Sequence, residues 1–454
     1  MSLVFFQKYT SFFPRFYKLA IVSLISNIMV PLAGLCDVAF LGHLKDIRYL
    51  ASVIIASILF DYLYGCLKFI RNSTNAMTAQ EVGKEDDRGV LLTLFRSGLI
   101  SLAIAVGILC LQYPIQKIGF GLLAVSLDVK ALGIEYFNAR IWDAPAVLVN
   151  FVLIGWFLGR EMNLFVLAMS LLASGSNVIL DYLMIFQWGW GSMGVGLATA
   201  ISQYLALLVG IVGVALTVRW QDVPPALQAM WDKQALKFTL ILKGNIMVRL
   251  LTRVSAYAIF TNISAQISTN VLAENGLLLQ IVLIGQFAIQ GIGMTIQTLV
   301  GNFQGKGETD KLLSVMLLGI VNSLAISSSL AFAVLWFPKT VLKLLSSHGE
   351  INQVIAQHTL WLLPLLICSA IAFMLEGYFI ALKIGSALRN SSLIAFFGIF
   401  SPFAFSAWYL KNVNLLWASL TLYMAAMMVV LGLDLYKMQS KELKVRLGLR
   451  ETPT

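Results

Sequence analysis

The stretch Phe16–Leu41, FYKLAIVSLISNIMVPLAGLCDVAFL, decides the class of fold. It carries one lysine near its start and one aspartate, Asp37, near its end, and its other residues are apolar or only weakly polar. A helix needs ~20 such residues to cross the ~30 Å hydrocarbon core of a bilayer, and this stretch is longer than that. We therefore expect it to form a transmembrane helix that carries one acid.

Similar apolar runs recur along the whole chain, which has 454 residues, 59% of them hydrophobic and 12% charged. Ordinary soluble domains are roughly 45–50% apolar and about 25% charged. Because a water-soluble core cannot absorb this excess, we predict an all-α polytopic membrane protein of twelve transmembrane helices. The predicted helices run over residues 16–41, 50–70, 89–111, 132–158, 163–186, 193–218, 236–260, 268–298, 312–337, 354–382, 390–410 and 415–436.

The formal net charge of +10 reflects lysines and arginines in the two terminal segments and the even-numbered loops, rather than on one basic face. This distribution indicates membrane topology, not nucleic-acid binding, and the positive-inside rule places both termini in the cytoplasm. The first apolar segment lacks a small-residue cleavage site, so we interpret it as a helix and not as a signal peptide. The four cysteines lie in apolar segments without a CxxC pair, and we expect no disulfide, metal cluster or cofactor.

An internal repeat divides the chain into two halves of six predicted helices. Three pairs of segments match in order: NIMV at 27–30 and 245–248, Gly-Lys at 83–84 and 305–306, and FVLIGWF at 151–157 with FMLEGYF at 373–379. The spacing is 218 residues for the first pair and 222 for the other two. Because six is even, the halves share one orientation and are expected to be related by a pseudo-two-fold axis along the membrane normal.

The repeat also predicts how the chain divides into domains. Residues 1–218 form the first lobe and carry the cation site, 219–235 form a cytoplasmic linker, 236–436 form the second lobe, and 437–454 form a basic cytoplasmic tail. The linker prediction rests on a polar stretch with two prolines, Pro224 and Pro225. We expect substrate to bind between the two lobes.

Ionisable groups within transmembrane helices cost ~2.5–3.5 kcal/mol on insertion scales and therefore indicate function. The acids in the predicted helices are Asp37, Asp61, Asp143, Asp181, Glu274 and Glu376. Asp37, Asp181 and Thr199 lie at similar depths near the outer face, and Asn177 precedes Asp181 by about one helical turn. These four residues predict a cation site, which holds either Na⁺ or a proton shared by two like-charged carboxylates. The roles of Asp61 and Asp143 stay open.

Five further residues are candidates for support or gating: Pro31, Tyr136, Arg249, Glu274 and Glu376. Pro31 favours a kink that is either static or coupled to Asp37. Arg249 lies near the bilayer centre and needs a partner, with Glu274, Glu376 or an acid of the first half as candidates. Glu376 is either a gate residue or a snorkelling side chain. Tyr136 either reaches Asp37 or belongs to the interfacial aromatic belt.

Several of these stretches resemble the multidrug and toxic compound extrusion (MATE) family, and most closely its DinF-type branch. They are VPLAGLCDVAFLGHL at 30–44, Arg71 through TAQEVG at 78–83, RIWDAP at 140–145 with GWFLG at 155–159, and NVILD at 177–181 with GVGLAT at 194–199. The resemblance covers nearly all twelve predicted helices. One departure is that Gln290 and Gln297 stand where DinF-type sequences tend to carry acids.

The resemblance implies two six-helix lobes that export organic compounds, often cationic or amphiphilic, in exchange for H⁺ or Na⁺ by alternating access. It implies that Asp37, Asn177, Asp181 and Thr199 form the cation site. It also places the chain in the bacterial cytoplasmic (inner) membrane, as a monomer whose partners are a small organic substrate, the ion and the lipid bilayer.

The sequence also allows two alternative functions to be compared with export. A lipid-linked saccharide flippase shares the two-lobe plan by analogy, but it requires a cationic cavity for a pyrophosphate. An intramembrane enzyme requires a nucleophile or a metal site, and the sequence contains no HExxH, GxSx or paired-aspartate protease pattern. We therefore expect a transporter and not an enzyme.

Overall fold

The computed structural model describes residues 12–44, 46–121, 126–337 and 358–446, and this part of the chain contains helices and no strands. Twelve helical segments are long and apolar enough to cross a membrane, as the sequence predicts. They are Phe13–Gly42, Arg48–Gly83, Asp87–Cys110, Leu127–Gly159, Asn163–Gln187, Gly191–Thr217, Lys233–Ile267, Asn270–Lys306, Thr309–Trp336, Thr359–Ala381, Gly385–Leu410 and Val413–Ser440. The start of the helix predicted at 354–382 lies outside the described residues.

The spans consist of the following individual helices, given in chain order. The first half contains α2 (Phe13–Gly42), α3 (Ile47–Leu67), α4 (Phe69–Gly83), α5 (Asp87–Cys110), α6 (Gln112–Gly121), α7 (Leu127–Arg140), α8 (Ala144–Gly159), α9 (Asn163–Tyr182) and α10 (Gly191–Thr217). The second half contains α12 (Lys233–Ile267), α13 (Thr269–Lys306), α14 (Leu312–Trp336), α17 (Leu362–Ala381), α18 (Gly385–Leu393), α19 (Ser401–Leu410) and α20 (Val413–Arg446). The short helix α11 (Val223–Ala229) connects the halves.

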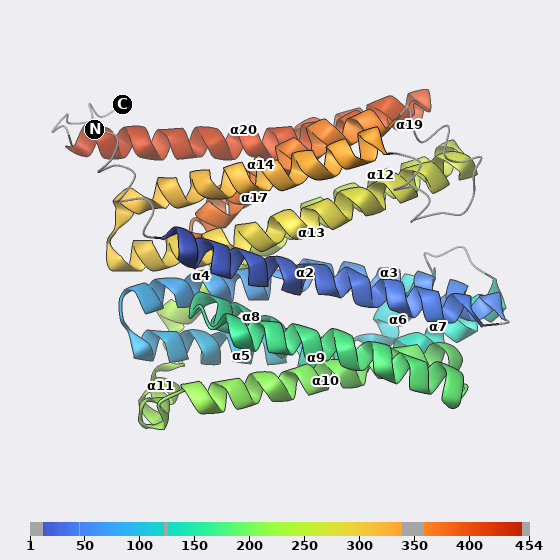
Figure 1. Cartoon of the computed structure of the whole chain (residues 1–454), viewed down its shortest axis with the longest axis horizontal. Coiled ribbons are helices and arrows are strands. Elements are labelled where there is room, and N and C mark those ends of the chain that lie inside the picture. Colours follow the sequence, from blue (N-terminus) through green and yellow to red (C-terminus); the bar gives the residue numbers. More distant parts are fainter. Residues whose placement is uncertain (1–11, 45, 122–125, 338–357, 447–454) are drawn as a thin grey trace.

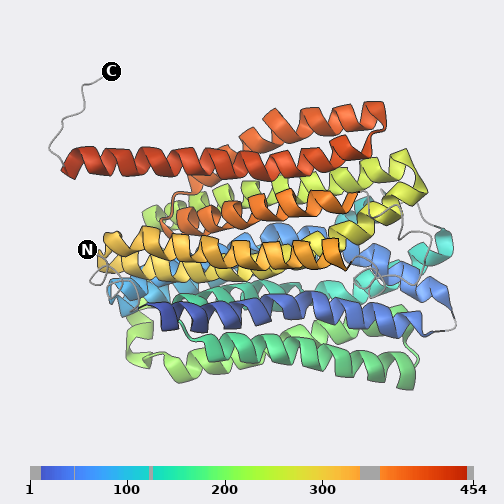
Figure 2. The same cartoon turned by 45° about the horizontal axis from the view of Figure 1, so that its top comes forward.

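Two bundles of roughly parallel and antiparallel helices lie side by side, one made of α2–α10 and the other of α12–α20 (Figure 1). The turned view in Figure 2 keeps the same division. Both ends of the described chain lie at one end of the molecule, on the left in Figure 1, which we call the terminal end. The opposite end is called the distal end.

The contacts within each half repeat at the spacing found in the sequence. A Cβ added to Gly155 would lie 2.4 Å from the carbonyl oxygen of Arg71, and one added to Gly377 would lie 2.6 Å from that of Gly293. Gly377 follows Gly155 by the same number of residues as Gly293 follows Arg71, so the two contacts are equivalent. Each fits only a glycine, because a side chain would collide with backbone.

A second pair of equivalent glycines meets where the halves touch. Added Cβ atoms on Gly83 and Gly305 would each lie 2.9 Å from the other glycine's Cα. Nearby, Gln80 Nε2 donates to the carbonyl oxygen of Ala381 at 2.5 Å, and Lys383 Nζ lies 3.2 Å from Glu81 Oε1. These contacts hold the halves together at the terminal end.

The segment after Ile70, which the sequence predicts as a polar break up to Arg88, is instead a helix. α4 continues the second membrane span to Gly83, and Ser73, Thr74 and Asn75 are fully buried. Its polarity is typical of a loop, but Ser73 and Asn75 bond to the other half and Thr74 packs against α8. Asn75, for example, bonds to α13 through Met294 and Thr298.

The segment predicted as a linker, 219–235, also contains helical structure. It holds a short helical turn at Trp220–Asp222, then α11, and α12 already begins at Lys233. Arg96 of α5 donates to the carbonyl oxygens of Ala229 at 2.9 Å and Met230 at 3.2 Å. The connection is therefore docked on the first half. The predicted tail at 437–454 likewise starts as helix, because α20 runs to Arg446; residues 447–454 lie outside the described part.

Candidate functional site

Asp37 on α2 and Asp181 on α9 meet near the distal end. Their carboxyl groups act directly on one another, although 144 residues separate them along the chain. Asp181 is fully buried, and within the described residues neither of its oxygens accepts a hydrogen bond; Oδ1 of Asp37 is equally unpartnered. Two facing carboxylates without donors are unfavourable in a low-dielectric site unless a proton or a cation joins them.

Asn177 and Thr199 complete the set of four that the sequence predicts to converge. Asn177 lies one turn before Asp181 on α9 and is buried, and its Nδ2 donates to Thr199 Oγ1 on α10 at 3.4 Å. The Thr199 hydroxyl in turn donates to the carbonyl oxygen of Val195 at 2.9 Å. The structure therefore brings α2, α9 and α10 together, with two carboxylates, an amide and a hydroxyl in one region. Their role in ion binding stays a prediction.

A π-helical turn follows the site directly. Residues Leu183–Gln187 continue α9 in this wider geometry, and the equivalent span of the second half contains a π-helical turn at Ile394–Phe400. Such turns place a side chain out of the regular helical register and occur often beside functional positions. In the first half the turn begins two residues after Asp181.

Arg140 at the end of α7 also acts on the acid pair, although the sequence did not identify it as part of this site. It donates to the hydroxyl of Tyr136, and its Nε lies 3.5 Å from Asp143 Oδ2. Asp143 also accepts a hydrogen bond from Tyr64, and the Arg140 guanidinium lies 4.6 Å from the centre of the Phe60 ring. Its positive charge acts on both Asp37 and Asp181.

The structure shows the surroundings of three residues that the sequence left open. Tyr136 is buried next to Arg140, so it does not belong to an interfacial belt. Asp143 is fully buried and compensates the charge of Arg140, whereas Asp61 is exposed. The signal was present in the spacing: Tyr136, Arg140 and Asp143 follow one another by four and three residues, which places them on one helical face.

A second group of charges lies between the two halves, close to the middle of the long helix α12. Arg249 forms an ion pair with Glu376 of α17, and both side chains are buried. The structure thus selects Glu376 from the candidate partners of Arg249, and it excludes a snorkelling role for Glu376. Glu274 is buried on α13 and forms no ion pair in the part of the chain that the structure describes.

A small cavity adjoins this ion pair, with about 330 Å³ of space around it that opens in part to solvent. Residues of both halves line it: Arg71, Asn72, Arg249, Arg253, Gln290, Gly293, Met294, Gln297, Phe373, Glu376 and Ile380. We call this set the interlobe cavity. Gln290 and Gln297, the two departures noted in the sequence, both belong to it.

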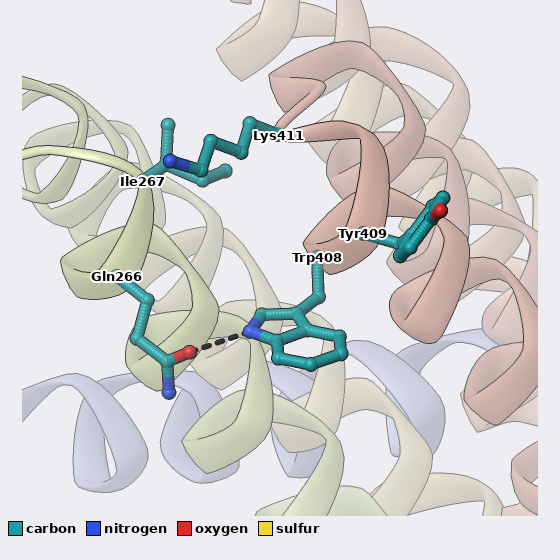
Figure 3. A pocket seen from close by; sticks show the side chains of 5 residues that line it. All are labelled: Gln266, Ile267, Trp408, Tyr409 and Lys411. Atoms are coloured by element: carbon teal, nitrogen blue, oxygen red, sulfur yellow. Dashed lines mark hydrogen bonds between the residues drawn. The ribbon is translucent and has the colours of Figure 1, made fainter.

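Two other features contribute less. α2 runs without interruption from Phe13 to Gly42 past Pro31, so a gating role for this proline stays a prediction. The pocket in Figure 3 lies at the distal end of α12 and α19, where Trp408 Nε1 donates to Gln266 Oε1 at 2.6 Å. Its exposed Trp408 and Tyr409 are typical of aromatic side chains at a membrane interface, and its residues belong to the second half, whereas the acid pair belongs to the first.

Comparison with known proteins connects this geometry to a family. The MatE family model matches the chain twice, over residues 23–183 and 246–406. The chain is 27% identical to DNA damage-inducible protein F of Escherichia coli (strain K12) over 90% of this chain and 89% of that protein. It is 22% identical to the probable multidrug resistance protein NorM of Thermotoga maritima, over 74% and 73% of the two chains.

Solved structures agree on the fold. The outward-facing conformation of a multidrug resistance MATE family transporter superposes with a TM-score of 0.84 at 18% identity and covers 96% of both chains. At this identity the likeness establishes the fold alone. The two matches of the family model each fall in one half of the chain, as the internal repeat predicts.

Proposed function

Because the chain belongs to the MatE family, we propose that it is a secondary antiporter that exports organic compounds in exchange for protons, with Asp37 and Asp181 as the proton site. The observation that carries this proposal is that the carboxyl groups of Asp37 and Asp181 act on one another while both oxygens of Asp181 and Oδ1 of Asp37 lack hydrogen-bond donors among the described residues. A proton shared by the pair supplies the missing hydrogen bond and removes one of two like charges.

The surroundings favour a proton over Na⁺ as the coupling ion. The positive charge of Arg140 already acts on Asp37 and Asp181, which opposes the entry of a second fixed cation. The Thr199 hydroxyl oxygen accepts from Asn177 and donates to Val195, so it is committed to protein partners. A Na⁺ site would need these oxygens turned toward the ion.

Alternating access would convert this protonation into transport. The ion can drive the change only if it binds the two conformations with different affinity, and the burial of Asp181 against α2 provides such a difference. Substrate would bind between the halves and leave when they open to the other side. We place the protein in a bacterial cytoplasmic membrane as a monomer, with both termini inside.

A lipid-linked saccharide flippase is the second candidate, because the interlobe cavity carries Arg71, Arg249 and Arg253. These cations match the requirement for binding a pyrophosphate. The acid pair, however, has no task in a pyrophosphate flippase. We therefore rank ion-coupled export first.

The test of the proton site is efflux by the Asp37→Asn variant in proteoliposomes of matched protein content. An amide cannot release a proton, so efflux driven by an imposed pH gradient should fall to that of protein-free vesicles while substrate binding in detergent persists. Asp181→Asn should be nearly as severe, and Thr199→Ala milder. Asp128→Asn is the matched control, because its side chain at the distal end is 72% exposed. Undiminished efflux by Asp37→Asn would remove this residue from the mechanism.

The same vesicles distinguish the two ions. A sodium gradient without a pH gradient should give no efflux, and Asn177→Ala should retain most of the activity, since only Na⁺ needs several oxygens around it. If sodium alone drives export and Asn177→Ala abolishes it, the four residues form a Na⁺ site instead.

A further inference from the structure

The interlobe cavity has an excess of positive charge that comes from both halves of the protein. Arg71 lies on α4 in the first half, and Arg253 lies on α12 in the second. Neither forms an ion pair within the described residues; Arg71 donates to Asn27 Oδ1 at 3.3 Å, and Arg253 lies over the ring of Phe373. Glu376, the carboxylate in the lining, is already paired with Arg249.

These cations are close enough to oppose one another. Arg71 and Arg253 repel each other across the boundary between the halves, and Lys68, which lies over the ring of Phe287, is repelled by both. The acid that acts on Lys68 is Asp61, an exposed carboxylate on α3. Holding such charges together in a low-dielectric region is costly unless an anion joins them.

The lining also contains polar atoms that lack partners. Nε of Arg71 and Oε1 of Gln297 are buried without a hydrogen-bond partner in the described chain, and Gln297 is only 5% exposed. The cavity itself has a free volume of about 20 Å³, which is enough for one water molecule. The present conformation therefore brings the guanidinium groups together around a space that holds no organic molecule until the halves separate.

From this juxtaposition we propose that the interlobe cavity binds an organic anion, a compound with a carboxylate, sulfonate or phosphate group on an apolar body, between Arg71 and Arg253. The proposal rests on the antiport function above and names its substrate class. Guanidinium groups bind such oxyanions through paired N–H donors, and the apolar body would contact Phe373, Met294 and Ile380.

The bound anion would also contribute to the movement. When it neutralises Arg71 of one half and Arg253 of the other, it removes the repulsion between the halves and favours their approach. A cationic compound would instead add a further positive charge beside the unpaired guanidinium groups. The charge of the cavity thus argues against the cationic substrates that the family resemblance implies.

The test compares two dyes with the same ring system and opposite charge, fluorescein as the anion and rhodamine 6G as the cation. Equilibrium binding is measured by fluorescence polarisation at about pH 8 with protein in nanodiscs of neutral phosphatidylcholine. We expect fluorescein to bind at least about tenfold more tightly, and Arg71→Gln and Arg253→Gln each to weaken it by about tenfold. Lys237→Gln is the matched control, because Lys237 is an exposed cation on the same helix α12.

Tighter binding of rhodamine 6G, or unchanged fluorescein binding in both arginine variants, would overturn the proposal. Added phosphatidylglycerol distinguishes the source of the anion. If it displaces fluorescein and is itself moved between leaflets by the protein, the anionic group belongs to a lipid, and if it does neither, the anion is a soluble compound.

Equilibrium binding needs no gradient, so the result is independent of the coupling mechanism. Asp37→Asn should bind fluorescein like the unmodified protein even where it fails to transport. If the unmodified protein does not bind fluorescein but exports rhodamine 6G when a proton gradient is imposed, the anion site is refuted and the antiport proposal stands. If the unmodified protein binds fluorescein as expected but its export does not depend on a gradient, the antiport proposal is refuted and the anion site stands.

Discussion

At the scale of single residues, the ion pair between Arg249 and Glu376 shows how a membrane protein tolerates charge near the bilayer centre. The two side chains are 4% and 8% exposed, so neither is solvated by bulk water. A buried pair is a weak source of net stability, but the loss of one partner leaves the other charge uncompensated. Arg249 also lies over the ring of Phe373, which partly screens its charge.

The Glu376→Gln variant should therefore be destabilised by roughly 3–5 kcal/mol, because Arg249 would keep its charge without a carboxylate. The measurement is the thermal unfolding midpoint in detergent. Combining Glu376→Gln with Arg249→Met should recover much of the loss, since the double variant buries no unpaired charge. If the double variant is as unstable as the sum of the single ones, the pair does not act as a unit.

The acid pair of Asp37 and Asp181 differs from the repeated features of the fold, because only the first half of the protein carries it. At the repeat spacings, Asp37 corresponds to Ser255 and Asp181 to Phe403. The shared fold explains why helices occupy equivalent positions in both halves, but only the first half has carboxyl groups at these positions. Ser255 instead lies 3.3 Å from the Tyr62 hydroxyl of the other half.

At the scale of elements, the glycines at the terminal end control how closely α4 and α13 approach. A Cβ on Gly83 would lie 2.1 Å from the carbonyl oxygen of Asn302, and one on Gly305 would lie 2.2 Å from that of Gln80. These are backbone atoms, which cannot rotate away as a flexible side chain does. The close approach of α4 and α13 at the terminal end therefore requires both glycines, whereas neither helix needs its glycine for its own conformation.

Gly83→Ala should separate the halves at the terminal end. The measurement is the distance between spin labels at Gln228 and Thr309, two exposed positions. Gln228 lies in α11, which is docked on the first half, and Thr309 begins the short helical turn Thr309–Lys311 in the second half. We expect a longer distance in Gly83→Ala than in the unmodified sequence. Gly98→Ala is the control, because no heavy atom lies within 4 Å of its added Cβ. An unchanged distance in Gly83→Ala would show that the helices adjust without opening.

The ion pair between Lys383 and Glu81 makes the same end sensitive to pH. Burial lowers the pKa of Lys383, and the neighbouring Glu81 opposes this effect without cancelling it. Lys383 therefore loses its proton at a lower pH than a free lysine, and the pair is intact below this lowered pKa and is lost as pH rises through it.

Raising the pH above neutrality should accordingly lengthen the distance between the labels at Gln228 and Thr309. Lys383→Arg should keep the short distance to higher pH, because a guanidinium stays protonated. Lys383→Gln should give a distance that does not depend on pH in this range. Identical pH curves for all three proteins would assign the transition to another group.

At the scale of the whole molecule, twelve spans with both described ends on one side are consistent with two halves that move as units. The contacts between the halves at the terminal end include a glycine pair, Gln80 to Ala381 and Lys383 to Glu81, and the ring of Phe303 packs against Phe12 and Arg15. Contacts of this kind can be broken and remade without unfolding either half. The docked α11 would then move with the first half.

The orientation of the molecule in the membrane is tested by labelling single cysteines in a cysteine-free background. Ser126→Cys at the distal end should react with a membrane-impermeant thiol reagent added to intact cells, and Ser440→Cys near the terminal end should react only after lysis. This orientation is predicted from the excess of lysine and arginine in the termini and even-numbered loops. Reaction of Ser440→Cys in intact cells would invert the topology and place the acid pair near the cytoplasm.

The sequence by itself determined the twelve spans and the two related halves, and it predicted that Asp37, Asn177, Asp181 and Thr199 lie at one depth. These features are local or periodic: hydropathy over one span, a match at fixed spacing, and the rise of 1.5 Å per residue along a helix. It placed α4 wrongly in a loop, because polarity alone does not tell a side chain facing water from one facing another helix.

Only the tertiary structure decided which charges meet. Glu376 is the partner of Arg249, the charge of Arg140 acts on the acid pair, and Arg71 and Arg253 line the same cavity. Each of these pairings joins helices far apart in the chain, and their rotation about their own axes is set by packing against several neighbours at once. A span's hydropathy fixes its depth in the membrane but leaves that rotation, and hence the partner of every buried charge, undetermined.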